Sequence, residues 1–379
     1  MFKQFCMLSL FIALVLMGSA TTRAQREGFI AVEGTSLRSK IDNAIRQGRA
    51  KQSRFWTAYS FEVRPGVAVD LEINNENGST TIVNGTSVSI GGSQVETRNL
   101  GIFALHEPSD GSISRIEIYN LDRQHEYSGY PVYWAGRATN EESLNYLKSI
   151  VDSDVNRLSD RAAFAIALHD DARVEAILTD MIRKPVAESI RNRAIYWLGY
   201  TAESQAKNAF LAEIVRNQRE STDAREQAMS ALGMSKAAAT LPLLETMYET
   251  MTSRDLKRRA LSGIARNDNR DAAATYLIRI AENERDFELR KSAIANLGRV
   301  AGEKSLSVLV STLDSSPEFE LQKTAVSAIG RRPKDESIPI LIRTARSHPR
   351  IEIRKLAVQA LGHTGDERAI AFLRELLGN

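Results

Sequence analysis

Cysteine is almost missing from this chain of 379 residues, which contains a single one, Cys6. Cys6 lies inside an N-terminal stretch that we expect to be removed, and no lipoprotein cleavage context surrounds it. The mature chain would then have no thiol for a disulfide, a cysteine zinc cluster or a lipid anchor. We therefore expect its stability to come from packing alone.

Long hydrophobic runs are also scarce. An apolar run from Phe5 to Met17 follows a positive start and precedes small residues, which is the pattern of a bacterial-type secretory signal. Cleavage after Ala20 or after Ala24 fits the small-x-small rule, so residues 1–24 are predicted to be a signal peptide. No second stretch of about 18 apolar residues follows. We expect a secreted, periplasmic protein without a transmembrane anchor.

Neither sign of charge is in excess. The chain has 50 Lys and Arg residues against 47 Asp and Glu residues, and Lys3 and Arg23 would leave with the signal. A nucleic-acid-binding domain normally carries a strong basic excess on one face. We therefore expect no nucleic-acid partner.

The motifs of common active sites are absent as well. The sequence has no His-Glu-x-x-His and no Gly-x-Ser-x-Gly, and Gly91-Gly92-Ser93 lacks the lysine of a phosphate-binding loop. His106, Glu107 and Asp110 could form a small polar cluster, although a loop histidine near a turn is the plainer interpretation. We expect no enzyme, no metal and no cofactor.

Residues 25–139 show a period of two residues broken by turn dipeptides, which predicts a β or α+β domain. Asn84-Gly85 is the clearest hairpin turn. A helix at residues 36–47, capped by Ser36, precedes the strands. We expect strands at residues 55–63, 67–73, 80–83, 86–90, 99–105, 112–119 and 131–135.

The period changes to 3.6 residues after Thr139, with Asn140 as the expected cap of the first helix. One phrase then occurs seven times, and its closing residues lie 30, 34, 32, 33, 32 and 32 positions apart. The copies are RAAFAIAL, RNRAIYWL, REQAMSAL, KRRALSGI, RKSAIANL, QKTAVSAI and RKLAVQAL. Such a period predicts helix pairs stacked in a line, so residues 140–379 are expected to be an α-solenoid of about seven repeats.

Three positions recur within and beside the phrase. Its fourth residue is alanine in six of the seven copies, which suits close helix contact, and a glycine that follows the phrase in five copies suits a left-handed helix end. Most copies begin with a cation, and in five copies an acid lies two residues before the first residue of the phrase. We expect these cations and acids to form charge pairs between adjacent repeats.

The motif acid-x-(Arg/Lys)-x-x-Ala-x-x-(Ala/Gly/Asn)-(Leu/Ile)-Gly over residues 141–379 resembles the HEAT-repeat family, in particular the short class named after phycobilisome lyases. The resemblance implies helix pairs whose second helices line a concave face. The class includes chromophore lyases, an iron-dependent hydroxylase with His-Glu dipeptides, and scaffolds without catalysis. His169, His348 and His363 are not followed by Glu, so the resemblance implies no di-iron centre here. The N-terminal part resembles no family that we can name.

Two features mark a candidate binding surface. The residue after the leading cation is basic in four successive repeats, which gives a row that Arg259 widens: Arg258, Lys291, Lys323 and Lys355. The row either binds a partner or is a solvated helix face. Tyr196 and Trp197 stand where other copies have small residues, and they either anchor a partner or fill a seam against the β-rich domain.

The sequence therefore predicts a secreted, non-catalytic scaffold whose concave face binds a protein or an acidic polymer. The alternative is a ligand-binding or enzymatic β-rich head positioned by the solenoid, which would bring His106, Glu107, Trp56 or Trp134 into one cleft. A third possibility is a structural envelope component. It would self-associate through a last helix at residues 367–377, which is expected to expose the following side chains: Ile370, Phe372, Leu373 and Leu376.

Overall fold

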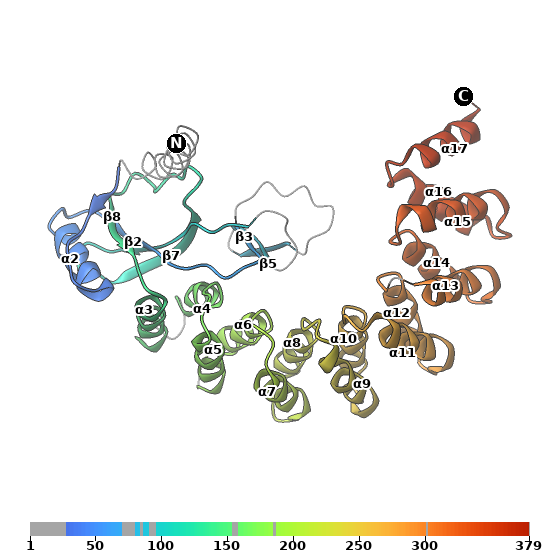
Figure 1. Cartoon of the computed structure of the whole chain (residues 1–379), viewed down its shortest axis with the longest axis horizontal. Coiled ribbons are helices and arrows are strands. Elements are labelled where there is room, and N and C mark those ends of the chain that lie inside the picture. Colours follow the sequence, from blue (N-terminus) through green and yellow to red (C-terminus); the bar gives the residue numbers. More distant parts are fainter. Residues whose placement is uncertain are drawn as a thin grey trace, which may run out of the picture. The chain divides into compact units, whose positions relative to one another are not determined.

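The computed structural model describes residues 28–69, 80–83, 86–90, 96–153, 158–184, 187–300 and 302–378. The expected signal peptide, the Asn84-Gly85 turn and the Gly91–Ser93 turn lie outside these residues. The chain divides between Thr201 and Ala202 into two compact units. The first contains the strands and two helix pairs, and the second contains the remaining helices (Figure 1).

A mixed β-sheet forms the centre of the first unit. Among the described residues its order is β1 (Ile30–Ala31), β8 (Val132–Arg137), β2 (Phe55–Ser60), β6 (Leu100–His106) and β7 (Ile113–Asn120). Strands β1, β8 and β2 are parallel, whereas β2, β6 and β7 are antiparallel. A second sheet has the order β3 (Val67–Val69), β5 (Thr86–Ile90) and β4 (Thr80–Val83). Both expected hairpins, β4–β5 and β6–β7, are confirmed.

Helix α2 (Leu37–Arg49) packs against β2 and β8 and makes the domain α+β. The predicted cap is confirmed, since the Ser36 side chain accepts the Ser39 N–H and the Ser39 hydroxyl oxygen accepts the Ser36 N–H. Gly48 brings the helix close to the sheet, because a Cβ there would lie 2.4 Å from the Phe55 ring. Successive strand residues alternate between the two faces. The opposite face therefore holds its own aromatic core around Trp56, Phe103 and Trp134.

The helices after the sheet form pairs. Their bounds are α3 (Asn140–Ser153), α4 (Ser159–Ala167), α5 (Arg173–Arg183), α6 (Glu188–Leu198), α7 (Gln205–Arg216), α8 (Thr222–Leu232), α9 (Leu241–Thr250), α10 (Arg254–Ile264), α11 (Arg270–Asn283), α12 (Phe287–Leu297), α13 (Glu303–Ser315), α14 (Phe319–Ile329), α15 (Lys334–Ser347), α16 (Ile351–Gly362) and α17 (Glu367–Leu377). The repeated phrase lies on the second helix of each pair. In the second unit these second helices form the inner layer of a curved double layer, and the first helices form its outer layer (Figure 1).

The fourth-position alanine is buried in each of the six copies that have it, as expected. The expectation for the glycines was wrong. Gly199, Gly233, Gly298 and Gly330 have φ between −60° and −73°, which is right-handed helical backbone. Within the second unit, glycine is needed for close approach, because a Cβ on Gly298 would lie 2.6 Å from the carbonyl oxygen of Ala328. The missing side chain thus lets the ends of α12 and α14 meet.

Asn140 was expected to cap α3, but it is the first residue of the helix, and Thr139 is the cap. Thr139 Oγ1 accepts the Glu142 N–H at 3.2 Å, and a Glu142 carboxylate oxygen accepts the Thr139 N–H at 3.2 Å. The other oxygen of Glu142 accepts the Leu37 N–H of α2 at 2.9 Å. These backbone hydrogen bonds lower the pKa of Glu142, the one to Leu37 most. One carboxylate therefore joins the starts of two helices that are far apart in the sequence.

Candidate functional site

The cations that begin the repeated phrase are structural. Four of them donate to the backbone of the residues that end the preceding helix: Arg191 to Ile182 O (2.9 Å), Arg225 to Val215 O (2.9 Å), Arg290 to Glu284 O (3.2 Å) and Arg354 to His348 O (3.0 Å). A helix leaves its last carbonyls without internal partners, and these guanidinium groups supply donors. The predicted pairing of the leading cations with the acids two residues earlier was wrong.

The first cation of the series, Arg161, has a different partner. Its guanidinium forms an ion pair with Glu117 of β7, and only 6% of its side chain is exposed. This contact joins helix α4 to the sheet within the first unit. The same junction also contains a backbone hydrogen bond, in which the Arg64 N–H donates to Leu168 O at 2.9 Å.

The predicted cation row lies on the inner layer of the second unit, and its charges are largely paired. Each of three members contacts the acid three residues earlier on its own helix: Arg258 with Asp255 (3.0 Å), Lys291 with Glu288 (2.7 Å) and Lys323 with Glu320 (3.7 Å). Lys355 is exposed and has no ion pair among the described residues. Arg259 pairs with Glu226 and also donates to Ser230 Oγ at 2.7 Å. The row is therefore accessible, but most of its positive charge is offset locally.

Tyr196 and Trp197 fill a seam inside the helical region. The Trp197 ring is 1% exposed and stacks on Phe164 of α4 with 4.8 Å between ring centroids. The hydroxyl groups of Tyr196 and Tyr200 lie 2.9 Å apart. The seam that Trp197 fills is thus between α4 and α6, whereas the expected seam was against the β-rich domain.

His106 is a buried structural residue. Its Nδ1 lies 2.8 Å from Gly111 O and its Nε2 lies 2.9 Å from Thr57 Oγ1, so both ring nitrogens have partners. The ring stacks on Phe55 on the α2 side of the sheet. Burial lowers the pKa of His106. The side chain is neutral at neutral pH and has no access to a substrate.

The other members of the expected polar cluster face elsewhere. Glu107 forms an ion pair with Arg54 at 2.9 Å, and Asp110 accepts the Ser112 N–H at 2.9 Å. Trp56 and Trp134 belong to the core on the opposite face of the sheet from His106. These residues therefore do not form the common cleft that an enzymatic head would need.

A serine–histidine contact that the sequence analysis missed lies where the sheet meets α3 and α4. His169 Nδ1 lies 2.8 Å from Ala165 O, its Nε2 lies 2.7 Å from Ser143 Oγ, and Ser143 Oγ lies 3.0 Å from the Tyr59 hydroxyl. Nucleophilic serines use such a contact with a base. Here all three side chains are at most 3% exposed, so no substrate can reach them. Burial lowers the pKa of His169 to about 4. The three hydrogen-bonded side chains form a buried polar joint between the sheet and the helices.

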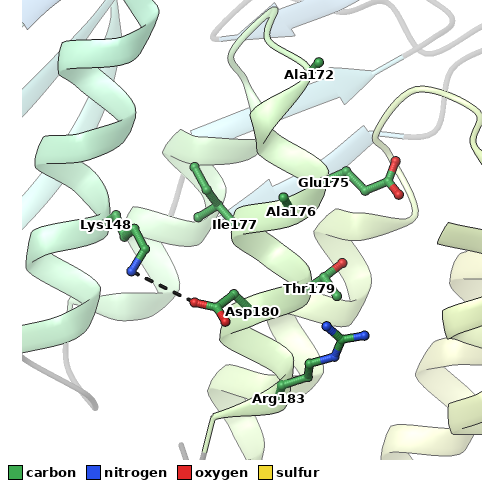
Figure 2. A pocket seen from close by; sticks show the side chains of 8 residues that line it. All are labelled: Lys148, Ala172, Glu175, Ala176, Ile177, Thr179, Asp180 and Arg183. Carbon is green, nitrogen blue, oxygen red and sulfur yellow. Dashed lines mark ion pairs between the residues drawn. The ribbon is translucent and has the colours of Figure 1, made fainter. Parts of the chain in front are cut away.

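A hollow of about 720 Å³ is lined mainly by α5, and Lys148 of α3 is also part of its lining (Figure 2). Lys148 of α3 reaches toward Asp180 of α5 at 4.0 Å, while Glu175, Thr179 and Arg183 line the other side of α5. Lys148 also contacts Asp152 at 2.8 Å. The hollow combines ion pairs with small side chains, and it contains no pairing of a nucleophile with a base.

Within the described ranges, no group of three or more His, Cys, Asp and Glu side chains is arranged to hold a metal ion. The helices in the same ranges include none with the length and apolar character needed to cross a membrane.

Comparison with known proteins supports the interpretation of the repeats. A family model described as HEAT repeats matches residues 248–329 and 307–379. No curated protein matches the chain. Similar solved structures include human deoxyhypusine hydroxylase in complex with glycerol. The match has 14% sequence identity and a TM-score of 0.32, and it covers 62% of this chain and 90% of that chain.

Two further structures have comparable scores. The complex of CpcE and CpcF of phycocyanin lyase from Nostoc sp. PCC7120 has 15% identity, covers 66% of this chain and 97% of that chain, and has a TM-score of 0.32. The match to the Escherichia coli protein YibA has 19% sequence identity and a TM-score of 0.34, and it covers 59% of this chain and 82% of that chain. The family model therefore places HEAT repeats at residues 248–379, and helix pairs of the same kind begin at α3.

Proposed function

We propose that this protein is a non-catalytic interaction scaffold that binds a protein or an acidic partner on the inner layer of its HEAT repeats. One observation carries the proposal: successive second helices present equivalent exposed side chains at a constant repeat, including those at Arg258, Lys323 and Lys355. Such a surface offers the same kind of contact many times along an extended partner. The candidate catalytic groups, in contrast, are buried or separated.

The alternative function, an enzymatic or ligand-binding head, has less support. It requires His106 and Glu107 in one cleft with Trp56 or Trp134, and the tryptophans lie on the opposite face of the sheet from His106. Self-association through α17 remains a further proposal. Ile370 is 41% and Leu376 is 54% exposed, whereas Phe372, expected to be exposed, is buried beneath the Arg346 guanidinium.

We further propose that the scaffold acts in the periplasm, because residues 1–24 have the pattern of a cleaved signal. Sequencing the N-terminus of the protein recovered from cells checks this directly. A first residue of Thr21 or Gln25 agrees with the proposal, and a retained Met1 contradicts it.

The function is tested by retention of partners from a cell-envelope extract. Full-length mature protein is immobilised beside the variant Lys291→Glu/Lys323→Glu/Lys355→Glu. The matched control reverses three exposed cations away from the second helices: Arg216, Arg219 and Lys304. We expect one protein to be retained by the wild type and the control and lost with the inner-layer variant. Equal retention by all three forms contradicts binding on the inner layer.

A further inference from the structure

A second column of cations follows the second helices of the last repeats. Arg266, Arg299 and Arg331 each come two residues after the closing residue of their phrase, and all three are exposed. Their spacings are 33 and 32 residues, and His363 holds the same position in the next repeat. The sequence analysis missed this column because it lies beyond the repeated phrase.

Arg299 and Arg331 have no acidic partner among the described residues, unlike every member of the cation row except Lys355. No described carboxylate lies within ion-pairing distance of either guanidinium group. The two acids that follow Arg331 most closely are engaged elsewhere, Asp335 with Arg368 at 3.0 Å and Glu336 with Arg332 at 2.7 Å. Two like charges are therefore held near each other without a counter-charge.

The contacts of Arg331 bring the two groups together. Its Nη2 donates to Ala295 O at 3.1 Å, which carries the guanidinium back over α12, the helix that ends beside Arg299. Burial lowers the pKa of Arg331, and the nearby charge of Arg299 lowers it further. An anionic ligand between the two would relieve this repulsion.

The surface around the pair is built from closely packed helix ends. A Cβ on Gly298 would lie 2.6 Å from the Ala328 carbonyl oxygen, so glycine lets the ends of α12 and α14 meet. Ala295, which accepts from Arg331, has a small side chain, and Ser327 of α14 is small and exposed. Small side chains leave the two guanidinium groups accessible to a ligand.

We propose that Arg299 and Arg331 bind the acidic side chains of an extended segment of a protein partner. This proposal rests on the scaffold function above and names the chemistry of its partner. Each guanidinium can hold one carboxylate through two parallel hydrogen bonds. Arg266 and His363 continue the column in both directions, so a longer acidic segment can span more repeats.

The test uses the full-length mature protein and a fluorescein-labelled peptide of alternating Glu and Ser, about ten residues long. Binding is measured by fluorescence anisotropy at about 50 mM salt, where screening is modest. We expect Arg299→Gln/Arg331→Gln to weaken binding by about tenfold or more, because two charge-assisted contacts are lost. The control Arg216→Gln/Arg219→Gln removes the same charge from the end of α7, and we expect it to bind within about twofold of the wild type.

Three results would overturn the proposal: no binding by the wild type, equal weakening by both double variants, or unchanged binding by Arg299→Gln/Arg331→Gln. Circular dichroism establishes that each variant is folded. A peptide with phosphoserine in place of each Glu is measured in parallel, and much tighter binding of that peptide would overturn the carboxylate assignment. In the envelope extract, a partner that still binds Arg299→Gln/Arg331→Gln as well as the wild type contradicts this site while leaving the scaffold function intact.

Discussion

His169 joins the sheet and the helical repeats of the first unit through a single imidazole. Both of its nitrogens have partners, Ala165 O and Ser143 Oγ, and its ring stacks on Phe61 at 4.1 Å between centroids. Burial holds its pKa at about 4, below the ordinary value of 6.5. The unfolded chain therefore binds a proton on this histidine at a higher pH than the folded chain does.

The first unit should lose stability as the pH falls. Between pH 6.5 and about 4 the unfolded state binds more protons at His169 than the native state, so the free energy of unfolding decreases with decreasing pH. We expect a loss of about 2 kcal/mol from His169 between pH 7 and pH 5. Urea unfolding followed by tryptophan fluorescence measures it, because Trp56, Trp134 and Trp197 all lie in the first unit.

The variant His169→Gln is the control for this effect. It should have a loss between the two pH values that is smaller by at least about 1 kcal/mol, with the remainder owed to groups such as His106. An unchanged loss in the variant would show that His169 does not carry the pH dependence.

Glycine at the ends of the second helices sets how closely these elements pack. Gly298 lies against the backbone of Ala328, and Gly233 and Gly263 approach each other in the same way. A Cβ on Gly233 would lie 2.9 Å from the Cα of Gly263, and a Cβ on Gly263 would lie 2.7 Å from the Cα of Gly233. A Cβ on Gly362, in contrast, would meet nothing within 4 Å. The same residue type in the same phrase therefore has different importance along the array.

Gly298→Ala should destabilise the second unit by about 1–3 kcal/mol, because the new methyl group forces α12 and α14 apart. Gly362→Ala is the matched variant, and it should stabilise α16 by about 0.5–1 kcal/mol, since its backbone is helical and the space is open. Urea unfolding followed by circular dichroism compares them. Equal effects of the two substitutions would contradict the close-approach explanation.

The elements were largely predictable from the sequence, whereas their contacts were not. The repeat period and the strand alternation depend on local patterns, so α17 and the hairpins agree with the prediction closely. The parallel pairing of β8 with β2 joins segments far apart in the sequence, and no local sequence pattern predicts it. The long cationic side chains of the phrase can each reach several partners within one helical turn. Spacing alone therefore did not show that Asp255 pairs with Arg258, or that leading cations such as Arg290 bind backbone carbonyl groups.

At the scale of the whole molecule, the two units have different kinds of interior and surface. The first unit is held by a sheet, buried polar joints and the Arg161–Glu117 ion pair. The second unit repeats one helix pair, which leaves an inner layer of equivalent exposed positions, and α17 packs against α15 and α16. Repetition of a surface is useful for recognising an extended partner, and this is the central claim for the protein.

Photo-crosslinking in cells tests that claim most directly. A photoreactive phenylalanine derivative replaces Ser327, which is exposed on the inner helix α14, or Ser311, which is exposed on the outer helix α13. We predict that the probe at Ser327 crosslinks to one partner protein and that the probe at Ser311 does not. Crosslinking from Ser311 alone, equal crosslinking from both positions, or none from either would contradict a scaffold that binds its partner on the inner layer.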